Sequence, residues 1–344
     1  MHFGFTDAQQ RLRASARDLL AEAASPADVR RVMDSETGID RELWRAMAGR
    51  GLLERSDFVE VAIVAEELGV TLACVPFLST AVLAAAVLGG LPPGTATVAF
   101  LDDRGRWDVA GAGARPSRSG HAWSLDGHAS YVLDGMVADV VVVAAGSSLF
   151  VVDGSRLTRA PLATVDRTRR LARVELTATP ARLLNAEGDG PAVLGRALDL
   201  AAVALAAEAV GGAQRCLDMT LAHVRSRTQF GRPLGAFQAV QHALADMVVD
   251  VESARATAYA AAWAATAAPD GLAAAASVAK ACCSEAFARA AAAALHLHGA
   301  LGFTWDHDVH LWFKRARSSR LLLGDPAFHR ERLAGSIGLP LPRR

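Results

Sequence analysis

Hydrophobic side chains recur at helical spacing through the first part of the chain, residues 1–92. Thr6 followed three residues later by Gln9 is a capping-box pattern, in which each side chain bonds to the other residue's backbone N–H. This pattern predicts a helix that begins there and ends near Ala24. Further helices are expected at residues 39–51, 58–68 and 78–88.

The pattern changes between residues 93 and 185, where short apolar or alternating runs are separated by glycine-containing turns such as Asp126-Gly127. Short strands at regular spacing with glycine turns are typical of a small antiparallel barrel or sandwich. Strands are expected within residues 97–101, 123–125, 129–133, 140–143 and 149–152.

Residues 186–344 return to long helical periodicity and are rich in alanine, the strongest helix former. Small alanine side chains let neighbouring helices pack closely, which favours a four-helix bundle that buries a further face against another subunit. We therefore expect an α+β fold, mainly α, with a helical domain at 1–92, a β domain at 93–185 and a bundle domain at 186–344. The bundle helices are expected at about 191–225, 236–267, 271–297 and 309–323.

Composition narrows the possible partners. The formal net charge is +0, which gives no sign of a nucleic-acid or anionic-membrane partner. The four cysteines have neither metal-ligand spacing nor a disulfide framework, and the histidines form no sequence cluster, so no metal site is expected. No uncharged apolar run reaches the roughly 20 residues that span a bilayer. A cytoplasmic protein without a membrane span is the expectation.

Two motifs carry the most specific signal. The first is Arg-Ser-Arg-Thr-Gln-Phe-Gly-Arg-Pro-Leu-Gly-Ala-Phe-Gln at 225–238, and the second is His-Leu-His-Gly-Ala-Leu-Gly-Phe-Thr-Trp-Asp-His-Asp at 296–308. Both resemble signatures of the acyl-CoA dehydrogenase family, and residues 120–135 resemble the middle β domain of that family. The resemblance follows nearly the whole chain in order.

The resemblance implies a flavin enzyme acting on an acyl-CoA thioester. In this family a base removes the α proton while the β hydrogen leaves as hydride to N5 of FAD, and electrons then pass to an electron-transferring flavoprotein. The α proton is acidic only if the thioester carbonyl is polarised, and the flavin supplies the electron acceptor.

The same resemblance implies which residues contact FAD, which the family binds across a subunit interface. Arg227 matches the arginine that meets the FAD diphosphate, although it could instead pair with a neighbouring carboxylate. The turn glycines are where backbone amides can approach phosphate, although glycine often only permits a turn. The expected cofactor-binding residues are Arg227, Phe230, Gln238, His296, Gly299 and Gly302.

The catalytic base of the family has no counterpart at its two usual positions, which here are Leu323 and Ala201. Neither side chain can accept a proton. Glu208 and Asp325 are weak candidates for a relocated base, and Glu208 is better explained as a structural ion pair within the bundle. The flavin-contacting Thr-Glu-Pro-type loop of active members also has no match near residues 99–109. Two acidic residues, Asp306 and Asp308, are expected to cap the helix beginning near Val309.

The resemblance therefore favours a base-lacking subunit that works with a homologous, base-bearing subunit. Some actinobacterial enzymes that shorten steroid side chains by β-oxidation pair a catalytic with a degenerate subunit in an α2β2 heterotetramer. Three alternatives stay open: an active homotetramer with a relocated base, a flavin-free scaffold or binding protein, and a flavin monooxygenase or oxidase that shares the fold.

Overall fold

The computed structural model describes residues 4–105, 107 and 113–339. The chain forms two compact units. We call residues up to 31 together with 55–73 and 202 onward the bundle unit, and residues 32–54 together with 74–201 the barrel unit. Helices, then strands, then helices follow one another along the chain, as the sequence indicates, while the three-domain division stays a prediction.

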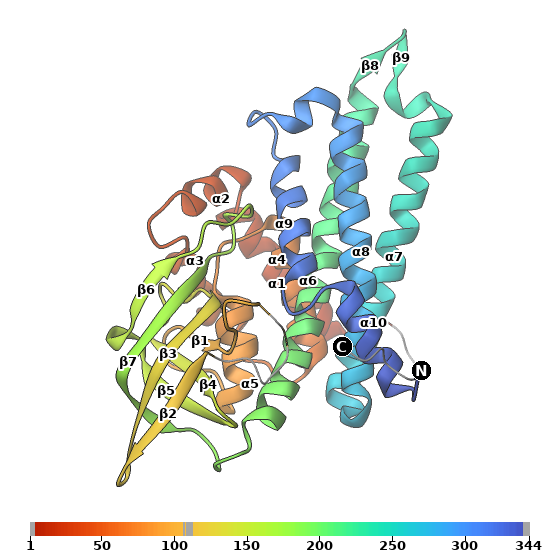
Figure 1. Ribbon diagram of the computed structural model, residues 1–344. Helices are drawn as coiled ribbons and strands as arrows, with labels where there is room; N and C mark the ends of the chain where they lie inside the picture. The colour runs from red at the N-terminus through yellow and green to blue at the C-terminus, as the bar shows by residue number, and fades with distance from the viewer. Residues whose placement is uncertain (1–3, 106, 108–112, 340–344) are drawn as a thin grey trace. The chain divides into compact units, whose positions relative to one another are not determined.

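The bundle unit is built on long antiparallel helices joined by short connections (Figure 1). Their buried faces are mostly alanine, which explains how they approach so closely. Its main helices are α6 (Gly190–Ser226, which begins in the barrel unit), α7 (Gln238–Ala267), α8 (Leu272–His298), α9 (Val309–Leu321) and α10 (Pro326–Ser336).

Two N-terminal helices, α1 (Asp7–Ala23) and α4 (Phe58–Thr71), complete the bundle unit. The predicted capping box is present at the start of α1, because Gln9 N donates to Thr6 Oγ1 at 3.2 Å and Thr6 N donates to Gln9 Oε1 at 3.0 Å. Helix α2 (Pro26–Met33) follows α1 and was not expected from the sequence.

Helices α4 and α6 touch through glycines. A Cβ on Gly211 would overlap the carbonyl oxygen of Glu66 and lie 2.8 Å from its carbonyl carbon. A Cβ on Gly69 would meet the Glu208 carbonyl group in the same way, 2.9 Å from its carbon. Both positions therefore require glycine for packing, since backbone atoms have no rotamer by which to move aside.

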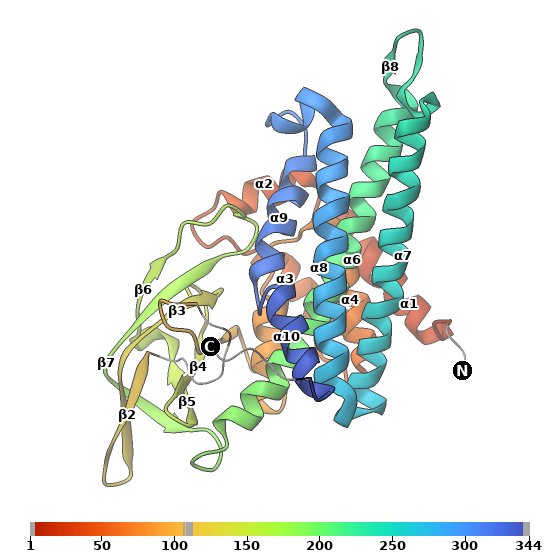
Figure 2. The ribbon, with the colours of Figure 1, turned by 45° about the vertical axis from the view of Figure 1, so that its right-hand side comes forward.

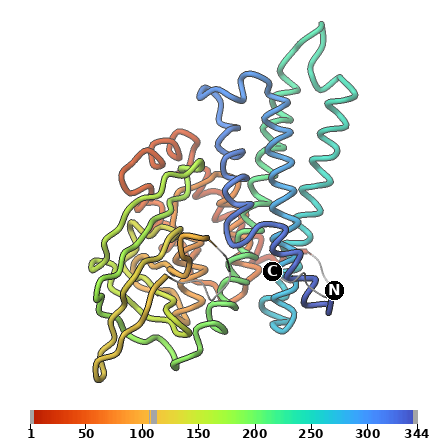
Figure 3. The backbone as a smooth tube through the Cα atoms, in the orientation of Figure 1, coloured from red at the N-terminus to blue at the C-terminus, as the bar shows by residue number. Residues whose placement is uncertain are grey.

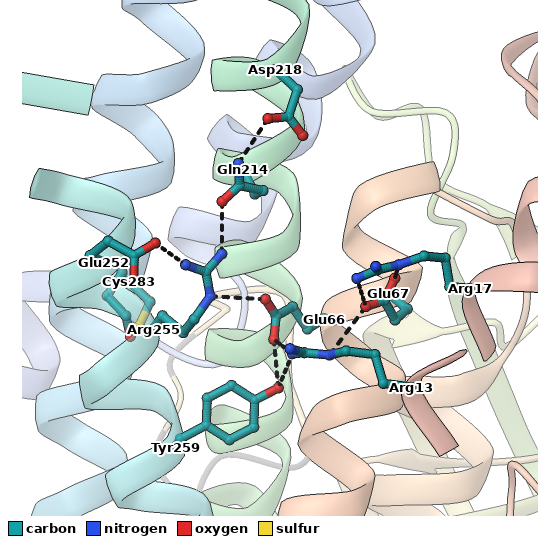
Figure 4. Close-up of polar contacts among 11 residues, drawn as sticks. Arg13, Arg17, Glu66, Glu67, Gln214, Asp218, Glu252, Arg255, Tyr259 and Cys283 are labelled. Carbon is teal, nitrogen blue, oxygen red and sulfur yellow. Dashed lines mark hydrogen bonds and ion pairs between the residues drawn. The ribbon is translucent and has the colours of Figure 1, made fainter. Parts of the chain in front are cut away.

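A buried ionic network ties α1, α4, α6 and α7 together (Figure 4). The Glu66 carboxylate is 7% exposed and accepts hydrogen bonds from Arg13, from the Tyr259 hydroxyl at 2.5 Å and from Arg255 Nε at 3.2 Å. Glu67 accepts two bonds from Arg17, at 2.9 and 3.1 Å. Burial raises the pKa of Tyr259, so its hydroxyl stays protonated and donates to Glu66. Each buried carboxylate therefore has charged or hydroxyl donors that offset its desolvation.

The barrel unit contains a seven-stranded sheet whose pairings close on themselves, because β4 pairs with both β5 and β2 (Figure 2). Of the predicted barrel or sandwich, the barrel is thus present, with one difference: β4 pairs in parallel with both β1 and β2, while the other pairings are antiparallel. The strands are β1 (Ala96–Ala99), β2 (Ala114–Ser119), β3 (Ala122–Leu133), β4 (Val140–Ala145), β5 (Ser148–Asp153), β6 (Thr158–Pro161) and β7 (Leu171–Leu183).

One local prediction for the barrel unit was wrong. Asp126-Gly127 is not a turn between strands, because β3 runs continuously through it and the register against β7 shifts there as a bulge. Gly127 has φ +120, which permits this bulge without strain. The expected helix at 78–88 is present, as a π-helix over Phe77–Ala84 followed by α5 (Ala85–Leu88). The unit also contains α3 (Arg41–Gly49) and a short 3₁₀ helix at Gly154–Arg156.

Among the described residues, no helix is both long and apolar enough to cross a membrane.

Candidate functional site at the bundle end

Two connections of the bundle unit carry the residues expected to bind the cofactor. One joins α6 to α7 through the hairpin of β8 (Thr228–Gln229) and β9 (Arg232–Pro233), which projects beyond the helices (Figures 1 and 3). The other joins α8 to α9 and contains the 3₁₀ turn η5 (Gly299–Phe303). Both connections lie at the same end of the bundle, which we call the bundle end (Figures 1 and 2).

The hairpin is anchored at its base by Arg227. Its N–H donates to the His223 carbonyl at 2.8 Å and continues the last turn of α6, while its carbonyl accepts from Leu234 N at 2.9 Å. The Arg227 side chain is exposed, and the described residues give its guanidinium no carboxylate partner. An exposed, unengaged guanidinium beside a rigid backbone fits an anionic group of a ligand.

The tip of the hairpin presents an aromatic side chain to solvent. Phe230 is 89% exposed and has φ 49, a left-handed conformation that bulky residues rarely adopt. Its ring packs edge-on toward Phe237, with 6.2 Å between ring centroids, and the Arg232 guanidinium lies 4.0 Å from the Phe237 centroid. Gln238 is exposed as the first residue of α7. An exposed aromatic side chain on a backbone held in this uncommon conformation is a candidate for a binding role.

The turn after α8 uses its two glycines differently. Gly299 has φ +61 and open space where a Cβ would be, so glycine is needed there for backbone conformation. Gly302 is buried, and a Cβ would lie 3.0 Å from the Leu295 carbonyl oxygen, so this glycine lets the turn pack on α8. Contact of Gly302 with a ligand stays a prediction. His296 is exposed on the last turn of α8.

Three histidines that the sequence shows only as scattered residues stack beside this turn. The His298 ring lies between those of His223 and His307, with centroid distances of 4.4 Å to each. His298 Nδ1 lies 2.7 Å from the Ala294 carbonyl oxygen. Because a carbonyl only accepts, Nδ1 carries the proton, and Nε2 is left as a buried acceptor without a hydrogen-bond partner among the described residues.

The surroundings keep these imidazoles neutral. Burial, and then the neighbouring His307 and His223, lower the pKa of His298 to about 4, although its bond to Ala294 acts in the opposite direction. Burial also lowers the pKa of His223, with Arg227 contributing, and that of His307, where Arg30 lowers it and Asp308 raises it. At neutral pH the stack therefore carries no charge.

The start of α9 corrects one expectation. Asp308 occupies the N-cap position but makes no capping hydrogen bond with its side chain; instead His307 Nδ1 accepts from Val309 N at 3.1 Å. The Asp308 carboxylate pairs with Arg30, whose Nη2 is 2.8 Å away. Asp306, the other expected cap, is exposed. A neutral His307 is therefore needed to cap α9, because a protonated Nδ1 could not accept.

The corner between α9 and α10 is the position at which the resemblance expects a base. Leu323 is 4% exposed and has φ +60, and Gly324 follows with φ +96, where a Cβ would meet the Phe328 ring. His329 Nε2 donates to the Leu323 carbonyl at 2.9 Å, since that carbonyl can only accept. Burial lowers the pKa of His329 to about 4.

A fully buried lysine from α8 holds the same corner. Lys280 Nζ donates to the Gly324 carbonyl at 3.0 Å, to the Arg320 carbonyl at 3.4 Å and to Ser284 Oγ at 3.0 Å. The corner is thus fixed from α8 and from α10, and the side chain that it carries at 323 is aliphatic.

The structure gives each carboxylate near the expected base positions another partner. Glu208 Oε1 accepts from Arg315 Nη1 at 2.8 Å, and the two side chains are 12% and 5% exposed. Asp325 accepts from Phe328 N at 2.8 Å and caps α10. Ala201 is fully buried. These contacts favour the structural explanation of Glu208 and a capping role for Asp325.

The six expected cofactor residues therefore lie on the two connections of one bundle end or on the adjoining helix turns, while the expected base positions lie elsewhere. The stretch at 99–109 falls partly outside the described residues. No group of three or more histidine, cysteine, aspartate or glutamate side chains in the described part of the chain is arranged to hold a metal ion.

Comparisons with known proteins agree with the resemblance. Residues 188–338 match the family model of the acyl-CoA dehydrogenase C-terminal domain. Acyl-CoA dehydrogenase IpdE2 of Mycobacterium tuberculosis (strain ATCC 25618 / H37Rv) is 36% identical over 340 residues, which cover 96% of this chain and 97% of the relative.

Two solved structures are similar over almost the whole chain. A chain of the Tcur3481-Tcur3483 steroid ACAD G363A variant is 32% identical with a TM-score of 0.86, and the match covers 96% of this chain and 98% of that one. A chain of the ChsE4-ChsE5 complex from Mycobacterium tuberculosis is 28% identical with a TM-score of 0.88, covering 99% and 100%. The whole-length sequence match, together with a fold of the same order of elements, shows that this chain belongs to the acyl-CoA dehydrogenase family.

Proposed function

We propose that this chain is the base-lacking subunit of a heteromeric, FAD-dependent acyl-CoA dehydrogenase, in which a homologous subunit supplies the catalytic base. The observation that carries the proposal is the corner at Leu323. Its backbone is fixed by Lys280 and His329, yet its side chain cannot accept a proton. Glu208 and Asp325 are already engaged by Arg315 and by the α10 backbone.

The bundle end is the part of this chain that fits the cofactor. Members of the family are FAD-binding flavoproteins, and bound flavin would accept the hydride. In this chain, Arg227 would face the diphosphate, Phe230 the adenosine part, and Gly299 would keep the turn that presents its backbone amides. The fit rests on the unengaged Arg227 guanidinium, the 89% exposed Phe230 ring and the left-handed Gly299.

The heteromeric assembly draws support from the solved relatives. Two similar structures are named as two-component proteins, Tcur3481-Tcur3483 and ChsE4-ChsE5. One of them is called a steroid ACAD, so we propose a CoA thioester of a bulky, steroid-derived acyl chain as substrate. Electrons would leave the reduced flavin to an electron-transferring flavoprotein, as the family resemblance implies.

Purification of the chain alone and with a homologous, glutamate-bearing subunit from the same genome tests this assignment. The visible absorption spectrum and the native mass are measured for each preparation. We expect flavin bands and a heterotetramer mass only for the co-purified pair. A yellow homotetramer from the chain alone would instead support the relocated-base alternative, and colourless protein in both preparations would support a flavin-free scaffold.

A matched pair of variants tests the cofactor contact. Arg227→Met removes the cation proposed to face the diphosphate, whereas Arg225→Met removes an equally exposed arginine two residues earlier. Loss of one charge-assisted contact with phosphate is expected to weaken FAD retention on the order of tenfold or more. Equal retention by the two variants would contradict the assignment of Arg227.

A further inference from the structure

The histidine stack (His223, His298 and His307) joins three segments that are far apart in sequence. His223 lies in the last turns of α6, His298 ends α8, and His307 caps α9. The Gly299–Phe303 turn begins at the residue after His298. The turn therefore starts directly beside a ring that stacks on His223 and contacts the tilted ring of His307.

The chemistry of the stack depends on its being uncharged. Neutral His298 carries one ring proton, on Nδ1, and donates it to the Ala294 carbonyl at 2.7 Å. Its Nε2 is unprotonated and buried. His307 needs an unprotonated Nδ1 to accept from Val309 N. Protonating the stack would place cations 4.4 Å apart between ring centroids and would remove the cap of α9.

The charged groups around the stack act on its protonation in both directions. Basic groups outnumber acidic ones, and Asp308 is already paired with Arg30. A proton added to His223 is thus opposed by Arg227, whereas at His307 the opposition of Arg30 is countered by Asp308. The charged and titratable groups that act on the stack are Arg30 from α2, Arg227 after α6, Asp308 before α9, and His310 on α9, which itself lies near Lys314.

We propose that His298 is the positioning residue of the Gly299–Phe303 turn, and that protonation of the histidine stack releases this turn. The assignment of the turn to nucleotide binding rests on the proposed function, whereas the coupling between the stack and the turn does not. When neutral, the stacked ring holds the turn against α8; when protonated, the turn and the first residues of α9 separate from the bundle end.

The expected size of the effect follows from proton linkage. A group whose pKa is about 4 when buried and 6.5 when released favours the released state increasingly as the pH falls. Between pH 7.5 and pH 5, His298 alone is expected to raise the equilibrium for opening of the turn about 25-fold.

Hydrogen exchange at residues 296–308, followed by mass spectrometry from pH 7.5 to pH 5, measures this opening. It is carried out on the full chain in the assembly in which it purifies, and rates are corrected for the intrinsic effect of pH. His298→Phe keeps a ring in the stack but cannot be protonated, so its turn should be protected at pH 7.5 and its acid-induced rise should be at least fivefold smaller than that of the wild type.

Two control variants separate the ring from other effects. His298→Asn can still donate to the Ala294 carbonyl but has no ring to stack, so its turn should exchange faster at every pH. His242→Phe changes an exposed histidine on α7 and should behave as the wild type. The proposal is overturned if the turn of His298→Phe is already open at pH 7.5, or if its rise with acid equals that of the wild type.

Titration of the histidine ring protons by NMR in the wild-type protein gives a second, independent result. Protonation of His298 at the pH where the turn opens supports the proposal, and a separation of more than about one pH unit overturns it. Flavin release over the same range tests the link to the proposed function. A preparation that never holds flavin would contradict the proposed function. The hydrogen-exchange result would still test whether protonation of the histidine stack opens the turn.

Discussion

Replacing Gly211 by alanine places a methyl group where α6 touches α4. In an unconstrained helix, alanine is favoured over glycine by about 1 kcal/mol, so the substitution would stabilise the protein if space allowed. Here the added Cβ would overlap the Glu66 carbonyl oxygen, with the carbonyl carbon 2.8 Å away and Val70 N 3.0 Å away. The contact is with backbone, so the helices themselves must separate.

Overpacking of a tightly packed interior costs about 1–3 kcal/mol and occasionally more. The upper part of this range applies to Gly211, because separating α4 from α6 also disturbs Glu66, whose buried carboxylate depends on Arg13, Arg255 and Tyr259. After the gain in helix propensity, a net loss of about 2 kcal/mol is expected. Gly195 lies in the same helix with nothing within 4 Å of its Cβ position, so Gly195→Ala is expected to gain about 0.5–1 kcal/mol.

Urea unfolding followed by circular dichroism measures both changes as shifts of the midpoint at constant slope. The two substitutions add the same methyl group to one helix, but they are predicted to change the free energy of unfolding in opposite directions. If Gly211→Ala were as stable as Gly195→Ala, the close approach of α4 and α6 would be refuted as a determinant of stability.

Three further changes test the polar interior. Tyr259→Phe removes one donor to the buried Glu66 carboxylate and should cost about 1–2 kcal/mol in urea unfolding; a cost below about 0.5 kcal/mol would mean that the arginines suffice. Lys280→Met leaves the Gly324 carbonyl without its donor and should cost about 1–3 kcal/mol, with faster amide exchange at residues 323–325; unchanged exchange there would show that the lysine does not hold the corner. His329 has a pKa lowered to about 4 by burial, so the neutral form stabilises the fold above pH 6.5, and stability should fall between pH 6.5 and 4 by up to about 1.4 kcal/mol per pH unit. His329→Gln should flatten that part of the stability curve, and a variant with an unchanged curve would exclude this histidine as a source of acid sensitivity.

Local patterns determined a large part of this protein from the sequence alone. The Thr6–Gln9 capping box starts α1 because both bonds join residues three apart, which the sequence alone specifies. Helix α8 lies within one residue of its predicted ends, since its alanine-rich run ends at a glycine. That Leu323 cannot act as a base is equally a property of the sequence, because no fold can give leucine a titratable group.

Only the tertiary structure decided how the polar residues are used. Glu208 could have been a base or half of an ion pair, and the packing of α6 against α9 brought Arg315 to it. The capping of α9 by His307 depended on Arg30, 278 residues from Asp308 in sequence, drawing that carboxylate away. The stack of His223, His298 and His307 has no signature in sequence, because it forms where three segments meet. Contacts between residues so far apart depend on the packing of whole helices, and no local pattern encodes that packing.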